Sequence, residues 1–367
     1  MTITEEIVYK ALGNVQEPDL KKDLVTLGMV QNVKIGVNQI NFTIVLTTPA
    51  CPLKEKIRKD CVDAIHNLID SSINVNIDFT SNVTSTRSNT PLLPDVKNII
   101  AIASGKGGVG KSTVTANLAV ALQRSGAKVG IIDADIFGPS IPTMFGMENT
   151  QPFIEKREDK NYIIPVIQYG VKLISIGFLT PPDQAVVWRG PMASTALKQF
   201  VTDVAWGELD YLLVDLPPGT SDIHITLVDA LPVTGAVVVT TQQKVSIIDA
   251  VKAIAMFRQS RIKVPILGIV ENMAYFTPYQ HPNEQYFLFG KDGGKLLADQ
   301  MQIPLLGQIP IVQDIMKAGD EGRPAIIGAN EIVSTAFKNL AEEVARQVAI
   351  RNANLDASIP VGVGVYN

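Results

Sequence analysis

The sequence predicts an α/β fold, in which a mostly parallel sheet carries helices on both faces and a small α+β domain precedes it. Three observations support this prediction. Beyond residue 98, apolar strand candidates alternate with helical patterns, which is the order expected of a parallel sheet. The first 80 residues have strand and helix periodicities of their own. The chain has 367 residues, which is more than one hydrophobic core usually serves.

The small domain is expected over residues 1–80. Apolar residues alternate at period two in the stretch 40–46, which is typical of a half-buried strand. Residues 81–97 are rich in Ser, Thr, Asn and Pro and have no periodic apolar face, which predicts a linker. The larger domain is expected over residues 98–350, and a flexible tail over residues 351–367.

Composition limits the possible partners. A net charge of -4 gives the whole chain no basic field, so we expect no nucleic acid partner. No run approaches the roughly eighteen apolar residues of a membrane-spanning helix, and the acidic start lacks the pattern of a secretory signal. Two cysteines make no disulfide framework. We therefore expect a cytoplasmic protein without a membrane partner.

A glycine-rich stretch follows the first strand candidate of the larger domain. Glycines let backbone N–H groups wrap around phosphates, and the helix that begins near Lys111 adds its partial positive charge. In the G-x-x-x-x-G-K-S pattern, Lys111 reaches the β- and γ-phosphates and Ser112 ligates Mg²⁺. The sequence thus predicts an ATP-binding loop that contains Gly105, Lys106, Gly107, Gly108, Val109, Gly110, Lys111, Ser112 and Thr113.

Lys106 is unusual, because a second lysine cannot easily share the same phosphates with Lys111 from one chain. The loop resembles the deviant Walker A class, the group of MinD, ParA and the nitrogenase iron protein. In that class the extra lysine crosses a dimer interface to the nucleotide of the partner. The resemblance implies a homodimer and a catalytic role for Lys106. A solvated surface lysine is the alternative.

Carboxylates follow two further strand candidates. Asp133 and Asp135 end one strand, and Asp215 ends another. Ligands of open parallel sheets bind at this edge, so the three acids are well placed for Mg²⁺ and an attacking water. By the same resemblance, Asp135 orients or activates the water, Asp215 holds Mg²⁺ through a water, and Asp133 supports the metal site. Capping of helix starts is the alternative, above all for Asp133.

Four further motifs narrow the resemblance to the Mrp/ApbC family of iron-sulfur cluster carrier ATPases, over about residues 97–345. They are Asp135–Ser140 (DIFGPS), Trp188–Met192 (WRGPM), Asp215–Thr220 (DLPPGT) and Glu271–Met273 (ENM). The first 80 residues are similar to the metal-sulfur assembly domain that precedes many bacterial members, at Glu17-Pro18, residues 27–30 and residues 48–52. The resemblance implies ATP and Mg²⁺ as cofactors and apo iron-sulfur proteins as clients. It also implies adenine contacts from Asn272 and Pro310.

One departure from that family concerns the cluster. Members normally carry Cys-x-x-Cys shortly after the Asn-Met-x-Tyr-Phe stretch, whereas this chain has Pro278 and His281 at those positions. Proline has no side-chain ligand atom, and His281 is interpreted as a surface loop residue rather than a ligand. The residues for ATP are therefore present, while the usual cluster site is missing.

The two cysteines differ in context. Cys51 precedes Pro52 at the expected start of a helix, where the helix dipole favours a thiolate, so it is the candidate iron-sulfur ligand. Packing remains an equal alternative for it. Cys61 lies on the apolar stripe of that helix and is expected in the core. Ten helical residues span about 15 Å, which excludes a disulfide or a shared cluster within one chain.

The leading functional hypothesis is a slow ATPase that binds iron-sulfur clusters and transfers them to apo-proteins as a homodimer. A maturation chaperone without its own cluster fits the missing cysteines and is the main alternative. A MinD- or ParA-like positioning ATPase needs a basic amphipathic C-terminal helix or a basic surface, but residues 331–351 mix both charges. A nitrogenase-like iron protein needs bridging cysteines, which this sequence lacks.

Overall fold

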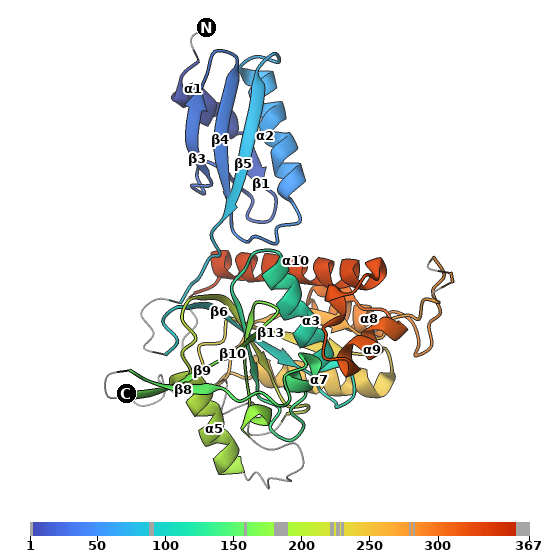
Figure 1. Cartoon of the computed structure of the whole chain (residues 1–367). Coiled ribbons are helices and arrows are strands. Elements are labelled where there is room, and N and C mark those ends of the chain that lie inside the picture. The colour runs from blue at the N-terminus through green and yellow to red at the C-terminus, as the bar shows by residue number, and fades with distance from the viewer. Residues whose placement is uncertain are drawn as a thin grey trace. The chain divides into compact units, whose positions relative to one another are not determined.

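A computed structural model describes residues 3–87, 92–157, 160–179, 190–220, 224, 228, 231–278, 280, 281 and 283–356. The chain forms two compact units (Figure 1). The smaller one comprises the chain up to Thr84 together with Ala349–Leu355, and the larger one comprises Ser85–Val348. The predicted motif residues Trp188 and Arg189, and residues 357–367 of the predicted tail, lie outside the described residues.

The smaller unit packs two helices against a three-stranded sheet of order β3-β4-β5. Strand β4 alternates buried and less buried residues, because only one of its faces lies on the core. A helical crossover joins β4 to the parallel strand β5. The elements are α1 (Glu5–Leu12), β1 (Gln16–Glu17), β2 (Lys22–Asp23), β3 (Val30–Ile35), β4 (Gln39–Leu46), α2 (Lys54–Leu68) and β5 (Asn74–Ser81).

The larger unit contains an eight-stranded sheet of order β10-β11-β7-β12-β6-β13-β14-β15. Only β10 runs antiparallel to its neighbour, so the predicted, mostly parallel sheet is confirmed. The strands are β6 (Val96–Ala103), β7 (Val129–Asp133), β10 (Val166–Gln168), β11 (Val171–Ser175), β12 (Leu209–Asp215), β13 (Gly235–Thr240), β14 (Ile266–Glu271) and β15 (Leu305–Gln308).

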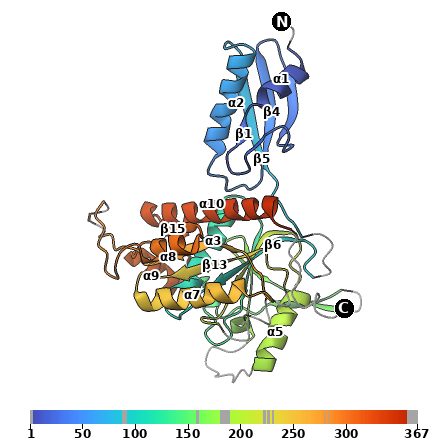
Figure 2. The same ribbon diagram turned by 180° about the vertical axis from the view of Figure 1, so that it is seen from behind.

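Helices cover both faces of this sheet. Helix α3 (Lys111–Arg124) lies on the face that is in front in Figure 1, and α7 (Lys244–Arg258) and α8 (Gly293–Met301) lie on the face that is in front in Figure 2. Because both faces are covered, strands β7 and β13 are buried along their whole length. The remaining elements are α4 (Ile141–Met144), β8 (Phe153–Arg157), β9 (Lys160–Ile164), η1 (Ile176–Phe178), α5 (Gly190–Thr202), α9 (Gln313–Asp320), η2 (Ala325–Ile327) and α10 (Glu331–Asn354).

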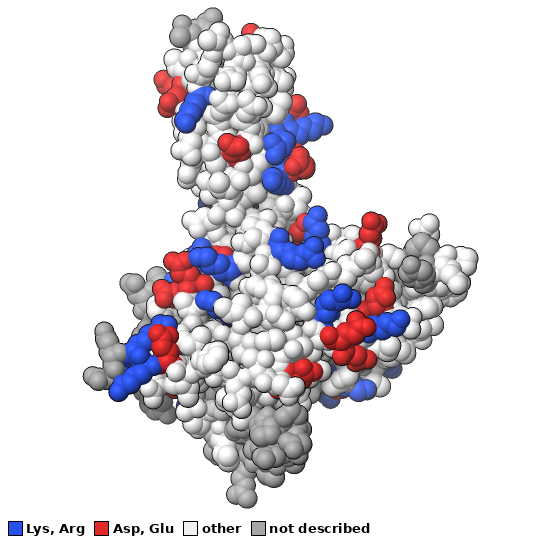
Figure 3. Space-filling view, viewed as in Figure 1, with Lys and Arg blue, Asp and Glu red and all other residues white. Residues whose placement is uncertain are grey.

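The last helix differs from expectation. Helix α10 continues to Asn354, so residues 351–354 are helical although the flexible tail was predicted to begin at 351. None of the helices in the described part of the chain is long and apolar enough to cross a membrane. On the face shown in Figure 3, lysine and arginine side chains lie interspersed with aspartate and glutamate side chains.

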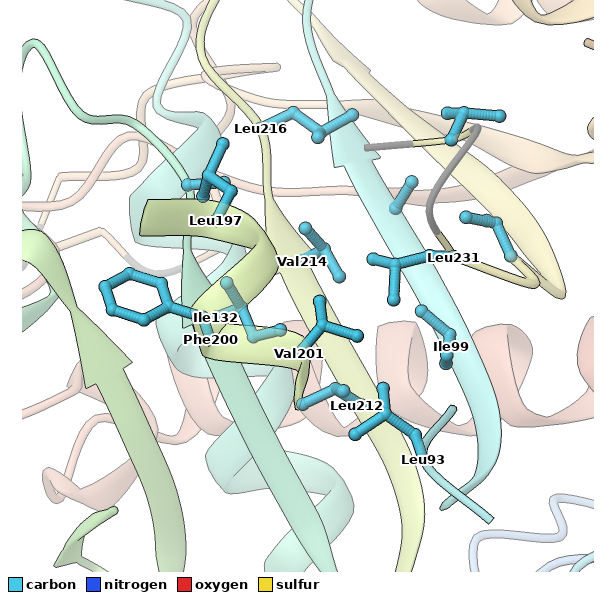
Figure 4. Packing of buried hydrophobic residues seen from close by; sticks show 14 of the residues in the cluster. Leu93, Ile99, Ile132, Leu197, Phe200, Val201, Leu212, Val214, Leu216 and Leu231 are labelled. Atoms are coloured by element: carbon cyan, nitrogen blue, oxygen red, sulfur yellow. The ribbon is translucent and has the colours of Figure 1, made fainter. Parts of the chain in front are cut away.

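One apolar cluster fixes the strands that carry the predicted site. Leu197, Phe200 and Val201 of α5 pack towards Ile132 of β7 and Val214 of β12 (Figure 4). Each large side chain buried in this way contributes about 1.5–3 kcal/mol relative to its exposed state. Strands β7 and β12 end at Asp133 and Asp215, so this cluster holds the backbone of both predicted carboxylates in place.

Candidate nucleotide-binding site

The predicted phosphate loop connects β6 to α3. Gly108 and Gly110 both have φ near +81°, a left-handed conformation that side chains other than glycine rarely adopt. Gly110 is also the residue that precedes the first turn of α3. The Ser104 hydroxyl donates a hydrogen bond of 3.0 Å to the carbonyl of Lys106. The loop therefore curls over the N-terminus of α3, where backbone N–H groups and the helix dipole favour an anion.

Two neighbouring elements clamp this loop from outside. A Cβ atom at Gly105 would lie 2.1 Å from the carbonyl carbon of Asp249 in α7, so the loop backbone touches the helix backbone there. On the other side, the Asn272 side-chain amide donates a hydrogen bond of 2.8 Å to the carbonyl of Val109. Glycine at position 105 is thus required by a close approach that the loop motif alone does not reveal.

Two side chains at the start of α3, the ammonium group of Lys111 and the hydroxyl of Ser112, contact the Asp215 carboxylate at the end of β12. Lys111 Nζ lies 2.9 Å from Asp215 Oδ2 and 3.8 Å from Asp135 Oδ2. The Ser112 hydroxyl donates a hydrogen bond of 2.6 Å to Asp215 Oδ2. Asp215 is fully buried and Lys111 is only 5% exposed, so each charge needs the other. The structure therefore brings together four residues that the sequence predicted.

Sequence reasoning missed two hydroxyl groups that hold the carboxylates. Thr115 Oγ1 lies 2.7 Å from Asp215 Oδ1, and Ser175 Oγ donates a hydrogen bond of 2.9 Å to Asp133 Oδ2. Thr115 follows Lys111 by one helical turn, so the two share a face of α3, and that spacing was the available signal. Ser175 comes from β11, the strand beside β7, and no local pattern marks it.

Asp133 is more deeply buried than Asp135. It is fully buried, accepts hydrogen bonds from Ser175 and from the backbone amides of Asp135 and Ile141, and does not line the cavity at the loop. Burial and the neighbouring Asp215 carboxylate raise the pKa of Asp133, while the hydrogen bond from Ser175 opposes this. Burial is also the main cause that raises the pKa of Asp135, against the charge of Lys111. Asp135 thus faces the cavity, whereas Asp133 is enclosed by the protein.

The phosphate loop borders a cavity of about 250 Å³. Its lining consists of Ser104, Lys106, Gly107, Gly108, Val109, Gly110, Lys111, Ser112, Thr113, Asp135, Ser140, Met144 and Pro218. Asn272 and Pro310, the predicted adenine contacts, are both buried outside this lining. Val312, two residues past Pro310, borders a larger cavity of about 680 Å³ beside α9 and the start of α10. Asn272 therefore contacts the phosphate loop through Val109 without lining its cavity, and Pro310 is not among the lining residues either.

Comparison with known proteins identifies the family to which this chain belongs. Residues 95–345 match the model of the NUBPL iron-transfer P-loop NTPases. The chain belongs to this family. Residues 5–77 match the model of the iron-sulfur cluster assembly proteins, so the NUBPL-type domain follows a second recognisable module. The predicted resemblance to iron-sulfur carrier ATPases with an N-terminal metal-sulfur assembly domain is therefore confirmed.

Relatives of this NUBPL-type chain are similar over nearly their whole length. It is 44% identical to an iron-sulfur cluster carrier protein of Synechocystis sp., and the alignment covers 95% of this chain and 99% of the relative. An Escherichia coli protein of the same description is 42% identical, and the alignment covers 93% of this chain and 92% of that protein. Among solved structures, a nucleotide-binding protein from Archaeoglobus fulgidus in complex with ADP has 41% identity and a TM-score of 0.56, over 64% of this chain and 90% of that one. Septum site-determining protein MinD from Pyrococcus horikoshii, complexed with Mg-ADP, has 27% identity and a TM-score of 0.50. That match covers 67% of this chain and 95% of the MinD chain.

The second lysine of the NUBPL-type loop is placed differently from the first. Lys106 is exposed at the rim of the phosphate cavity, whereas Lys111 is buried against Asp215. The two lysines of one chain therefore occupy different environments.

The cysteines of the NUBPL-type chain also occupy different environments. Cys51 is half-buried in the turn before α2, which begins only at Lys54, so the helix starts later than predicted. Cys61 is fully buried between Ile57 and Ile65, and burial raises the pKa of its thiol to about 12. That burial confirms the predicted core position and removes Cys61 as a thiolate ligand.

The positions of the missing Cys-x-x-Cys offer no substitute site. The His281 side chain is 61% exposed and lies 3.7 Å from Glu284. In the part of the chain that the structure describes, no group of three or more His, Cys, Asp or Glu side chains is placed to hold a metal ion. A cluster ligand set from these side chains is therefore not assembled within one described chain.

We predict that Gly105→Ala lowers the free energy of unfolding of the larger unit by about 1–3 kcal/mol or more, because the new Cβ overlaps the α7 backbone. Gly107→Ala is the matched control, since its Cβ would lie 3.9 Å from Pro218. Denaturant unfolding without nucleotide, followed by tryptophan fluorescence, reports this unit, because both tryptophans belong to it. Equal losses in the two variants would contradict the close approach of loop and helix.

Proposed function

We propose that this chain is a slow cytoplasmic ATPase that acts as a homodimer, binds iron-sulfur clusters and transfers them to apo-proteins. The ATPase half of the proposal rests on the contacts of Lys111 and Ser112, which line the phosphate cavity, with the buried Asp215 carboxylate. The cluster half rests on the two relatives at 44% and 42% identity, which are named iron-sulfur cluster carrier proteins and match both modules of the chain.

The loop binds ATP through its backbone N–H groups and through Lys111, whose charge faces the β- and γ-phosphates. The oxygen groups beside it fit Mg²⁺, because the Ser112 hydroxyl, which lines the cavity, can ligate the ion and the Asp215 carboxylate, 2.6 Å from that hydroxyl, can hold one of the ion's waters. Bound Mg²⁺ neutralises charge on the phosphates. In this proposal Asp215 holds the ion through a water, and Asp133 supports it from behind.

Asp135 is the proposed group for the attacking water. Its carboxylate lines the phosphate cavity and is held 3.8 Å from Lys111, so it can orient a water and accept its proton. Asn272 and Pro310 are proposed to contact the adenine, beyond the end of the loop that Asn272 already binds through Val109. These roles divide the site into phosphate, water and base contacts.

Lys106 is proposed to act across a homodimer. Its exposed position at the cavity rim suits a charge that reaches the nucleotide of a second copy, where it stabilises the charge that develops in the transition state. Hydrolysis then depends on dimer formation, which links the nucleotide state to the assembly that would carry a cluster.

A cluster bound by this protein is proposed to use Cys51. Because Cys61 is buried with a raised pKa, the further thiolates must come from a second copy, a client protein or small thiols. The replacement of Cys-x-x-Cys by Pro278 and His281 favours a second candidate function, an ATP-dependent maturation chaperone without its own cluster. Iron and sulfide content after anaerobic reconstitution distinguishes the two.

We predict that Lys106→Ala still binds ATP but loses hydrolysis, whereas its counterpart Lys111→Ala loses binding. The first removes only a charge needed in the transition state across the dimer, and the second removes the charge that faces the phosphates. ATP affinity by calorimetry and phosphate release measure the two effects separately. If Lys106→Ala weakens binding as strongly as Lys111→Ala, Lys106 serves its own site instead.

We predict that Cys51→Ser abolishes the iron-sulfur absorbance of the reconstituted protein and leaves ATP hydrolysis unchanged, because the cysteine lies in the smaller unit. Cys61→Ala is the matched control and should retain the absorbance with some loss of stability. Full iron and sulfide content in Cys51→Ser would refute the ligand assignment. If the wild-type protein never takes up a cluster, the chaperone hypothesis replaces the carrier hypothesis.

A further inference from the structure

We infer that Thr115 is a positioning residue that orients the Asp215 carboxylate and thereby sets the affinity of the nucleotide site for Mg²⁺. This inference rests on the proposed function, in which Asp215 holds the ion. Thr115 lies outside the G-x-x-x-x-G-K-S pattern, and neither the motif nor the family descriptions assign it a role.

The two oxygens of Asp215 have separate tasks in the structure. Oδ2 lies against the start of α3, where it receives the Ser112 hydroxyl at 2.6 Å and lies 2.9 Å from Lys111 Nζ. Oδ1 faces the interior, where Thr115 Oγ1 lies at 2.7 Å. Thr115 is fully buried, and it is not among the described residues that line the phosphate cavity. It therefore acts on the substrate only through Asp215.

The hydroxyl of Thr115 has one proton and two acceptors within reach. The carbonyl of Lys111 lies 3.0 Å away, as is common for a threonine inside a helix, and Asp215 Oδ1 lies 2.7 Å away. Hydrogen bonds to an ionised acceptor are shorter and about twice as strong as those to a neutral one. The shorter contact is the one to the carboxylate, so we assign the proton to Asp215.

This hydrogen bond restrains the terminal side-chain torsion of Asp215, which the pairing of the strand backbone does not fix. The backbone of Asp215 is fixed, because β12 pairs with β6 on one side and with β7 on the other up to this residue. The terminal torsion of an aspartate is broad, so a carboxylate held at one oxygen can still rotate. With Thr115 on Oδ1, the plane is set and Oδ2 stays directed at Ser112, where the ion is proposed to bind.

The test measures binding of Mg²⁺ rather than turnover. Thr115→Val keeps the shape of the side chain and removes the donor, and Thr115→Ser keeps the donor. Thr234→Val is the matched control, because Thr234 is also buried and its hydroxyl accepts a hydrogen bond of 3.1 Å from Ile99 N, before the start of β13 at the opposite edge of the sheet. Affinity for a fluorescent, non-hydrolysable ATP analogue is measured in EDTA and in rising Mg²⁺.

We expect Thr115→Val to need about tenfold more Mg²⁺ for half of the Mg²⁺-dependent gain in affinity, which is the loss of one hydrogen bond to a charged group. Its affinity in EDTA should stay within about twofold of the wild type. Thr115→Ser and Thr234→Val should behave like the wild type. Thr115→Cys, whose thiol is a weak donor, should lie between Ser and Val and provides the test if the valine variant does not fold.

The Asp215→Asn variant distinguishes a failure of the proposed metal site from a failure of the role inferred for Thr115. If it shifts the Mg²⁺ requirement while Thr115→Val does not, the role of Thr115 is refuted and the proposed metal site stands. If Asp215→Asn leaves the requirement unchanged, the proposed role of Asp215 fails, and the role of Thr115 fails with it. If Thr115→Val weakens binding equally in EDTA and in Mg²⁺, Thr115 is a packing residue of α3 and the inference is overturned.

Discussion

The fully buried carboxylate of Asp215 is compensated by groups from the first turns of α3. Lys111 supplies a positive charge at 2.9 Å, and the hydroxyls of Ser112 and Thr115 lie at 2.6 and 2.7 Å. A buried charge without such partners carries a penalty of several kcal/mol, so the end of β12 and the start of α3 stabilise each other. Because α3 begins where the phosphate loop ends, the same interaction fixes the loop relative to the sheet.

The loop conformation and its function follow from this constraint. The close approach of Gly105 to α7 and the hydrogen bond from Asn272 hold the outer side of the loop, while Asp215 holds its helix end. Lys111 is thereby kept at the cavity in a buried position, where it pairs with the Asp215 carboxylate. In the proposed function, the phosphates of ATP compete with this carboxylate for the ammonium group of Lys111, and Mg²⁺ bound near Asp215 replaces that positive charge.

Much of this arrangement could be predicted from the sequence, because parallel strands bring their carboxyl ends to one edge. That rule placed Asp135 and Asp215 beside Lys111 and Ser112 without any knowledge of side-chain geometry. The rule did not identify Thr115 and Ser175. Buried hydroxyl groups are common in proteins, and these two gain a role only from the carboxylates that they contact. The need for glycine at position 105 also depends on α7, a helix more than a hundred residues later. For Cys51, the helix was expected to start at Pro52, whereas Leu53 is the residue that precedes its first turn.

The account can be tested most directly by a crystal structure of this chain with Mg²⁺ and a non-hydrolysable ATP analogue. On nucleotide binding, Lys111 is expected to exchange Asp215 for the phosphates while the other contacts of the carboxylate persist. The account predicts that Lys111 Nζ moves from Asp215 to the β- and γ-phosphates, and that the Asp215 carboxylate faces the ion with the contact to Thr115 retained. A structure in which nucleotide is bound and Lys111 still pairs with Asp215 would contradict it.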